Sequence, residues 1–171
     1  MNKIGLLVKD ILKRYRISQP PYKYLQKIAK GYGILVKLNP NLEDDISGFL
    51  YLKDKKPTIF VNQNNPPLRR HFTIAHELGH FLLGHNGDLF VDKGQIIYRD
   101  SRSKEGTLLQ EREANRFAAE LLMPEEMLID EIVKNDYDLD DSLEVQGLSE
   151  KFGVSTQAMM IRLTNLGWSL F

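Results

Sequence analysis

His76-Glu77-Leu78-Gly79-His80 places two histidines four residues apart, inside a stretch from Leu68 to Leu83 that has the spacing of one continuous helix. Residues four apart on a helix lie on the same face, about 6 Å apart along its axis, so both imidazoles can reach one metal ion. Two such histidines with an adjacent glutamate are typical of a zinc site in which the carboxylate acts as general base. The pattern therefore predicts metal-dependent hydrolysis, with His76 and His80 as ligands and Glu77 as the catalytic base.

Residues around this motif support a helix with defined ends. Asn65 is predicted to cap it, Pro66 and Pro67 suit its first turn, and Gly84 suits its end. Apolar residues recur at spacings of three, four and seven, which predicts a helix packed against a core. This stripe comprises Phe72, Ala75, Leu78, Gly79 and Leu82.

A third ligand is expected from a second predicted helix, Leu108 to Met123, which Pro124 ends. Its periodicity puts Glu111 on the side of the apolar residues, where an unpaired carboxylate would be costly. Glu111 is therefore the predicted ligand, and Asn115, one turn later, is predicted to orient a ligand through a hydrogen bond.

The charged side of the same helix is predicted to hold Glu113, Arg116 and Glu120. Glu113 can be solvated there beside Arg116, so its removal is expected to cost little. The predicted ligand set suits one Zn²⁺ per chain, although imidazole and carboxylate ligands also accept other divalent ions.

Two runs carry a resemblance to a known family. They extend from Arg70 to Phe81 (RHFTIAHELGHF) and from Glu111 to Pro124, in which Glu111, Ala114, Asn115 and the end Leu121-Leu122-Met123-Pro124 stand out. Together they resemble the ImmA/IrrE metallopeptidase family. Further agreement covers Ile59-Phe60-Val61-Asn62, Phe152-Gly153-Val154-Ser155, Arg162-Leu163 and Leu166-Gly167, so the resemblance spans roughly Ile46 to Gly167.

The resemblance implies a small cytoplasmic zinc endopeptidase with a gluzincin-like ligand set. Known members cleave a helix-turn-helix repressor and so switch on mobile-element or stress genes, which makes such a repressor the expected protein substrate. The implied fold is α+β, with a zincin-like core that combines a small three-stranded sheet with the two metal helices. Some members carry an additional C-terminal sensor domain, which is not expected here because the sequence stops soon after the resemblance ends.

A pass along the chain predicts a metallopeptidase domain over residues 1–125 and a helix-turn-helix-like helical segment over residues 126–171. Three short strands are expected at Ile34–Leu38, Ser47–Leu52 and Thr58–Val61. An exposed edge near Thr58–Asn62 is expected to align an extended peptide substrate. Helices are expected at Ile4–Tyr15, Tyr22–Lys30, Leu143–Phe152 and Ser155–Leu166, and Gln95–Tyr98 is predicted to be a lid or an extra strand.

Composition limits the other classes of function. The 171 residues suit one domain with a small appendage, and the absence of cysteine fits a reducing cytoplasm. No apolar run approaches a membrane span, so neither membrane insertion nor a signal peptide is expected. Residues 1–30 carry eight basic residues against one acidic, a net +7, whereas residues 136–171 carry two basic against six acidic, a net −4.

Two alternatives stay open at this point. The C-terminal helices could bind DNA, but a DNA-binding face must be basic, and this region offers little beyond Arg162. A non-catalytic protein-binding regulator with the same fold is the second alternative, against which the intact Glu77 argues. His71 and His85 lie outside the four-residue spacing and, with Tyr98, are expected to lie outside the catalytic set.

Overall fold

A computed structural model describes residues 3–52, 56–85, 89–93 and 104–168. The chain divides into two compact units, one of Leu25–Ala118 and one of Met1–Tyr24 with Ala119–Phe171. The α+β class predicted from the sequence is confirmed. The predicted domain boundary between residues 125 and 126 concerns independent folding and stays a prediction.

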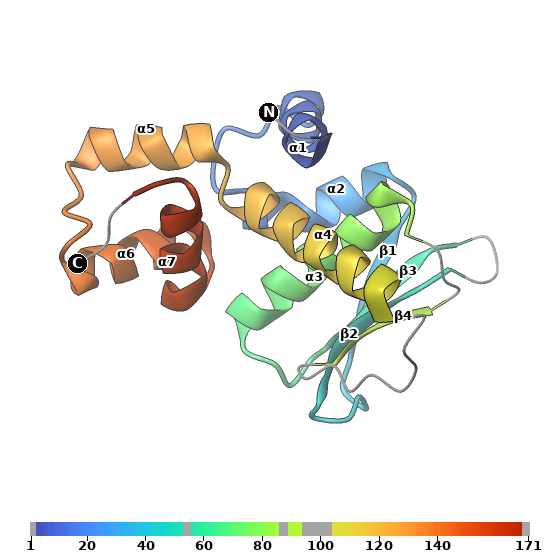
Figure 1. Cartoon of the computed structure of the whole chain (residues 1–171). Helices are drawn as coiled ribbons and strands as arrows, with labels where there is room; N and C mark the ends of the chain where they lie inside the picture. The colour runs from blue at the N-terminus through green and yellow to red at the C-terminus, as the bar shows by residue number, and fades with distance from the viewer. Residues whose placement is uncertain (1–2, 53–55, 86–88, 94–103, 169–171) are drawn as a thin grey trace. The chain divides into compact units, whose positions relative to one another are not determined.

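A mixed sheet forms one side of the Leu25–Ala118 unit. Its order is β1 (Leu35–Asn39), β3 (Thr58–Asn62), β2 (Ile46–Tyr51) and β4 (Leu89–Lys93) (Figure 1). β1 runs parallel to β3, whereas β2 is antiparallel to both β3 and β4. The three predicted strands are present, and β4 adds a fourth. The Gln95–Tyr98 run lies outside the described residues.

The predicted exposed edge at Thr58–Asn62 is wrong. β3 is hydrogen-bonded to β1 on one side and to β2 on the other, so its backbone is already paired. Its side chains fit this central position, because Ile59 and Val61 are fully buried. Asn62 at its end is also buried, and its amide donates to the carbonyls of Glu43 and Ile46 at 3.1 and 2.9 Å.

Helix α3 (Pro67–Leu83) contains the histidine motif and packs on β2 and β3. Asn65 was the predicted cap, but Pro66 occupies the cap position and no side chain caps the helix. Its φ of −55° suits the entry to a helix, and Pro67 has no N–H to satisfy. The predicted end is confirmed, since Gly84 adopts the left-handed conformation with φ 70°.

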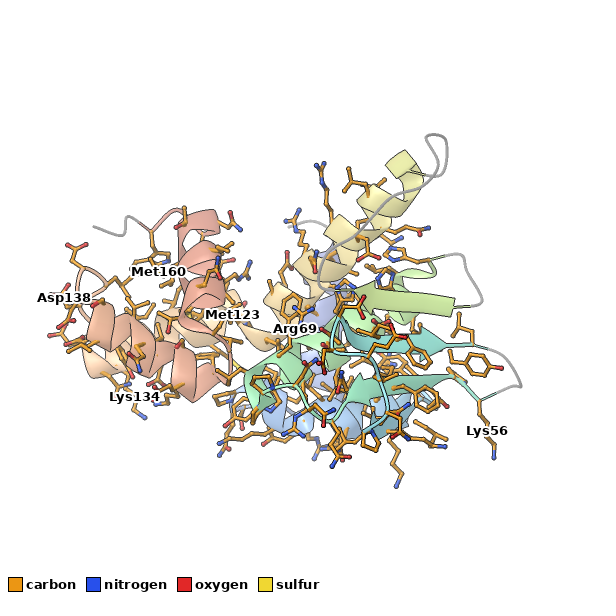
Figure 2. All side chains as sticks on the ribbon, turned by 90° about the horizontal axis from the view of Figure 1, so that it is seen from below. Lys56, Arg69, Met123, Lys134, Asp138 and Met160 are labelled. Atoms are coloured by element: carbon orange, nitrogen blue, oxygen red, sulfur yellow. The ribbon has the colours of Figure 1, made fainter. Side chains whose placement is uncertain are left out.

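Two contacts hold the first half of α3 on the sheet. A Cβ added at Gly48 of β2 would lie 2.5 Å from Thr73 Cγ2 and 2.5 Å from the Phe60 carbonyl oxygen, so only glycine fits between the helix and the sheet. Arg69, labelled in Figure 2, donates from Nε to Ser47 Oγ at 2.9 Å. These contacts fix the position of α3 and therefore of its histidines.

Helix α4 (Lys104–Leu122) lies against the second half of α3. A Cβ added at Gly79 would lie 3.1 Å from Phe117 Cδ1 and 3.2 Å from Ala114 Cα. Ala114, Phe117 and Ala118 are fully buried, as the predicted apolar side requires. The absence of a side chain at Gly79 thus allows the two helix backbones to approach closely.

The predicted helix Tyr22–Lys30 is divided into a 3₁₀ turn, η1 (Pro21–Tyr24), and α2 (Leu25–Gly31), which contacts β1 and α3. Among the described residues, the second unit contains η1, the last turn of α4 and four further helices. These four helices are α1 (Lys3–Arg14), α5 (Glu125–Asn135), α6 (Ser142–Phe152) and α7 (Thr156–Asn165).

α6 and α7 form the predicted helix-turn-helix-like pair. Gly153 ends α6 with φ 66°, and the Ser155 hydroxyl caps α7 by accepting from the Ala158 N–H. The ring of Tyr22 packs so closely on Gly153 that an added Cβ would lie 2.6 Å from it. Within the described part of the chain, no helix has the length and apolar character needed to cross a membrane.

We expect Gly79→Val to force α3 and α4 apart and to lower the free energy of unfolding by about 1–3 kcal/mol, the usual cost of overpacking a core. Urea denaturation monitored by circular dichroism measures this change. Gly106→Val is the matched control, because Gly106 lies in α4 with open space around its Cβ position. Equal stability of the two variants would contradict the close helix approach.

Candidate metal centre

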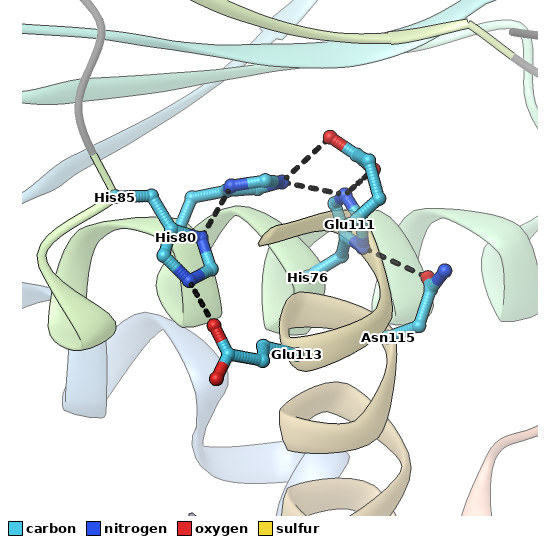
Figure 3. A network of polar contacts seen from close by, with 6 residues as sticks. All are labelled: His76, His80, His85, Glu111, Glu113 and Asn115. Carbon is cyan, nitrogen blue, oxygen red and sulfur yellow. Dashed lines mark hydrogen bonds and ion pairs between the residues drawn. The ribbon is translucent and has the colours of Figure 1, made fainter. Parts of the chain in front are cut away.

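Three side chains from α3 and α4 converge on one point (Figure 3). The Nε2 atoms of His76 and His80 lie 3.0 Å apart. Glu111 places one carboxylate oxygen 3.2 Å from His76 Nε2 and the other 3.2 Å from His80 Nε2. The structure thus brings together the three predicted ligands, each with a ligand atom aimed at the others.

The two helices position this cluster through their packing. His76 and His80 are one turn apart on α3, and Gly79 lies between them against Ala114 of α4. Glu111 precedes Ala114 by three residues, which places it on the same side of α4, about one turn earlier. The histidines are almost fully buried, and 20% of the Glu111 side chain is exposed.

The spacing of the three groups fits a small divalent ion. Ligand atoms that hold zinc tetrahedrally at 2.0–2.1 Å lie about 3.3–3.4 Å from one another. The distances of 3.0 and 3.2 Å among the two imidazoles and the carboxylate are close to this value. His76, His80 and Glu111 could therefore hold an ion with little rearrangement.

The other ring nitrogen of each histidine also has a polar contact. His76 Nδ1 lies 3.0 Å from Asn115 Oδ1, and His80 Nδ1 lies 2.9 Å from His85 Nδ1. An amide oxygen only accepts, so His76 must carry its proton on Nδ1 for this contact to be a hydrogen bond. With a metal ion held by the cluster, that tautomer would direct the Nε2 lone pair of His76 at the ion.

The pKa values of the cluster also favour the forms that bind metal. Burial raises the pKa of Glu111, but hydrogen bonds and charge interactions with His76 and His80 outweigh it and lower this pKa to about 2. For His80, burial is the largest cause and the net pKa is lowered, although Glu111 opposes the shift. At neutral pH these shifts favour an ionised carboxylate and a neutral imidazole, which are the ligating species.

Glu77, the predicted base, is fully buried on α3 beside His76. Burying an ionisable side chain is costly, and such positions are common at functional sites. His71 is not part of the three-residue cluster, and Tyr98 lies outside the described residues.

Two expectations for the charged side of α4 are wrong. Glu120 is buried, with 8% of its surface exposed. Glu113 is not simply solvated, because its Oε2 lies 3.2 Å from His85 Nε2, although 45% of its side chain is exposed. Helical periodicity placed Glu113 and Glu120 on a charged face of α4. It could not show which residues from other parts of the chain pack against that face.

His85 was expected to lie outside the catalytic set, as a surface or capping residue, and only 5% of its side chain is exposed. The reason is the chain reversal at Gly84, whose N–H bonds to the Phe81 carbonyl while the His85 N–H bonds to that of His80 at 3.1 Å. This pair of bonds is the Schellman arrangement, which returns the chain over the last turn of the helix. Gly84 directly before His85 was therefore the sequence feature that could have indicated this turn.

Known proteins resemble this chain over most of its length. A curated relative, "Uncharacterized immunity region protein 2" of Bacillus phage phi105, is 28% identical over 145 residues, covering 85% of this chain and 83% of that protein. A solved structure described as a Mycobacterium tuberculosis transcriptional regulator is similar with a TM-score of 0.66 and 19% identity. The match covers 96% of this chain but 47% of that one, so the chain spans about half its length.

The family comparison covers most of the chain. The model of peptidase family M78, described as the IrrE N-terminal-like domain, matches residues 29–164, which include both helices of the cluster. The resemblance read from the two motifs is therefore confirmed, and this chain belongs to the family of the IrrE N-terminal-like domain.

Proposed function

We propose that this chain is a zinc-dependent endopeptidase that cleaves a helix-turn-helix transcriptional repressor and so derepresses mobile-element or stress genes. The observation that carries the proposal is the convergence of His76, His80 and Glu111 within hydrogen-bonding distance of one another. Membership in a metallopeptidase family supports the same reading. In this proposal the three side chains hold one Zn²⁺ per chain, and Glu77 is the catalytic residue.

A zinc ion held by these residues would supply Lewis acidity, polarising the scissile carbonyl and acidifying a water molecule. Glu77 takes a proton from the attacking water as the new C–O bond forms, and it later delivers that proton to the nitrogen of the departing amine as the peptide C–N bond breaks. Because Glu77 is fully buried, its carboxylate is shielded from bulk solvent. Asn115 holds the ring of His76 in the orientation and tautomer that ligation needs.

The choice of substrate rests on the family resemblance and on one relative. The phage phi105 relative is named for an immunity region, which supports a target among repressors of mobile elements. The similarity to the transcriptional regulator from Mycobacterium tuberculosis supports the fold alone.

An extended substrate needs an available strand edge beside the site. β3 cannot provide it, because β1 and β2 flank it. Among the residues that the structure describes, β1 and β4 are the outer strands, and β4 contacts α3. We therefore assign backbone pairing of the substrate to the outer edge of β4.

The two alternatives are less well supported. Arg162 is the basic residue of α7, and its Nε donates to the Met123 carbonyl at 3.1 Å, so it is already engaged within its own unit. With a net charge of −4 over residues 136–171, this segment suits phosphate poorly. A binding module without catalysis would have no need of a buried Glu77, because metal binding does not require that side chain.

The assigned ligands make a prediction about metal content. Elemental analysis after dialysis should find about one zinc ion per wild-type chain, whereas His76→Ala, His80→Ala and Glu111→Ala should each lose most of it, since two ligands hold zinc poorly. His71→Ala is the control and should retain the ion. Retention of a full equivalent by the His76→Ala/His80→Ala double variant would rule out the assigned site.

A substitution at Glu77 should separate metal binding from catalysis. Glu77→Gln keeps the shape of the side chain but removes the base, so the variant should bind zinc like the wild type and cleave at least about a hundredfold more slowly. The assay mixes each protein with a purified helix-turn-helix repressor, with and without chelator, and maps the products by mass spectrometry. The exposed Glu125→Gln is the matched control.

Wild-type, zinc-loaded protein should cut the repressor at one or a few sites, and Glu77→Gln should bind it without cutting. Tight binding of an intact repressor by the wild type would instead support a non-catalytic regulator. Equal cleavage by Glu77→Gln and wild type would refute hydrolysis at this site.

A further inference from the structure

We propose that His85 and Glu113 are positioning residues, which form a hydrogen-bonded chain that orients His80 for metal binding. The inference deepens the proposed function and rests on it, because it assigns supporting residues to the same site. Figure 3 shows the chain running from His80 through His85 to the carboxylate of Glu113.

Both links of the chain are within hydrogen-bonding distance. His85 Nδ1 lies 2.9 Å from His80 Nδ1, and His85 Nε2 lies 3.2 Å from Glu113 Oε2. The rings of His80 and His85 meet edge to face, with their centroids 4.9 Å apart. Each ring nitrogen of His85 thus faces a polar partner, and His85 connects the buried cluster to a partly exposed carboxylate.

The Glu113 carboxylate at the end of the chain determines the direction of both hydrogen bonds. An ionised carboxylate only accepts, so His85 carries its proton on Nε2 and donates to Glu113. Its Nδ1 is then an acceptor, which takes the proton that His80 carries on Nδ1. His80 is left with a lone pair on Nε2, the atom that lies beside Glu111 and His76.

The Nδ1 atoms of the two proposed histidine ligands therefore have different hydrogen-bond partners. The amide oxygen of Asn115 accepts from His76, whereas His80 donates into a chain that ends on a carboxylate. A partner of this kind fixes the ring orientation and raises the basicity of the imidazole, which strengthens its bond to a metal. Loss of the chain should therefore weaken metal binding without removing a ligand.

A purely structural explanation for His85 is that a buried imidazole needs partners wherever it lies. That explanation predicts an effect on folding stability alone. The positioning role predicts in addition that the affinity for zinc falls, and that Glu113, with 45% of its side chain exposed, matters only while His85 is present.

The test is zinc affinity, measured by competition with a chromogenic chelator, together with the rate of zinc release. We expect His85→Ala to bind zinc about 10- to 100-fold more weakly than wild type, the usual effect of removing a partner of a ligand. Glu113→Ala should weaken binding about tenfold, and Glu113→Gln, which keeps an acceptor, should lie closer to wild type. The His85→Ala/Glu113→Ala double variant should match His85→Ala, because Glu113 acts through His85.

His71→Ala is the control for loss of a histidine of α3 that lies outside the cluster, and its affinity should equal that of wild type. Thermal unfolding of the metal-free proteins checks that each variant folds, and the partly exposed Glu113 offers variants that keep the core intact. Unchanged zinc affinity in folded Glu113→Ala and His85→Ala, with wild type binding one ion, would overturn this inference alone. Failure of the wild type to bind zinc would overturn the proposed function with it.

Discussion

The site depends on one close approach, between Gly79 of α3 and Ala114 of α4. A Cβ at Gly79 would lie 3.2 Å from Ala114 Cα, so the separation of the two helices is set by the missing side chain. Since Glu111 lies one turn before Ala114, this approach places its carboxylate over His76 and His80. The sheet also fixes the position of α3, because Thr73 of α3 packs directly on Gly48 of β2. The packing of α3 against α4 therefore also sets the relative positions of His76, His80 and Glu111.

The electrostatics of the cluster follow from that packing. Two almost fully buried imidazoles and a carboxylate lie within 3.2 Å of one another, which lowers the pKa of Glu111 to about 2. Hydrogen bonds to Asn115 and His85 engage the outer nitrogens, so the inner ones are directed at a single point. Such pre-organisation would reduce the rearrangement that accompanies the proposed binding of an ion.

Local periodicity was enough to predict the central part of the site. The four-residue spacing placed His76 and His80 on one face, and the apolar side of α4 distinguished Glu111 from Glu113 as the residue that meets them. The same reasoning placed Asn115, whose oxygen lies 3.0 Å from His76 Nδ1. These relations involve residues one turn apart, which helix geometry fixes without knowledge of the rest of the fold.

Features that depend on distant partners were missed or mistaken. The position of β3 at the centre of the sheet follows from pairing with β1 and β2, which the sequence of one strand does not specify. The contact between His85 and His80 was missed, because helical spacing says nothing of the path of the chain after Gly84. In each case the missing information was a non-local contact or a turn conformation.

The central claim is that His76, His80 and Glu111 hold one metal ion, and anomalous X-ray scattering tests it most directly. Crystals of the zinc-loaded protein, measured on both sides of the zinc absorption edge, should show one anomalous peak per chain. The account predicts that peak about 2.0–2.2 Å from both Nε2 atoms and from a Glu111 oxygen. A zinc peak bound by other residues, or histidine rings turned away from a cluster without an anomalous peak, would contradict it.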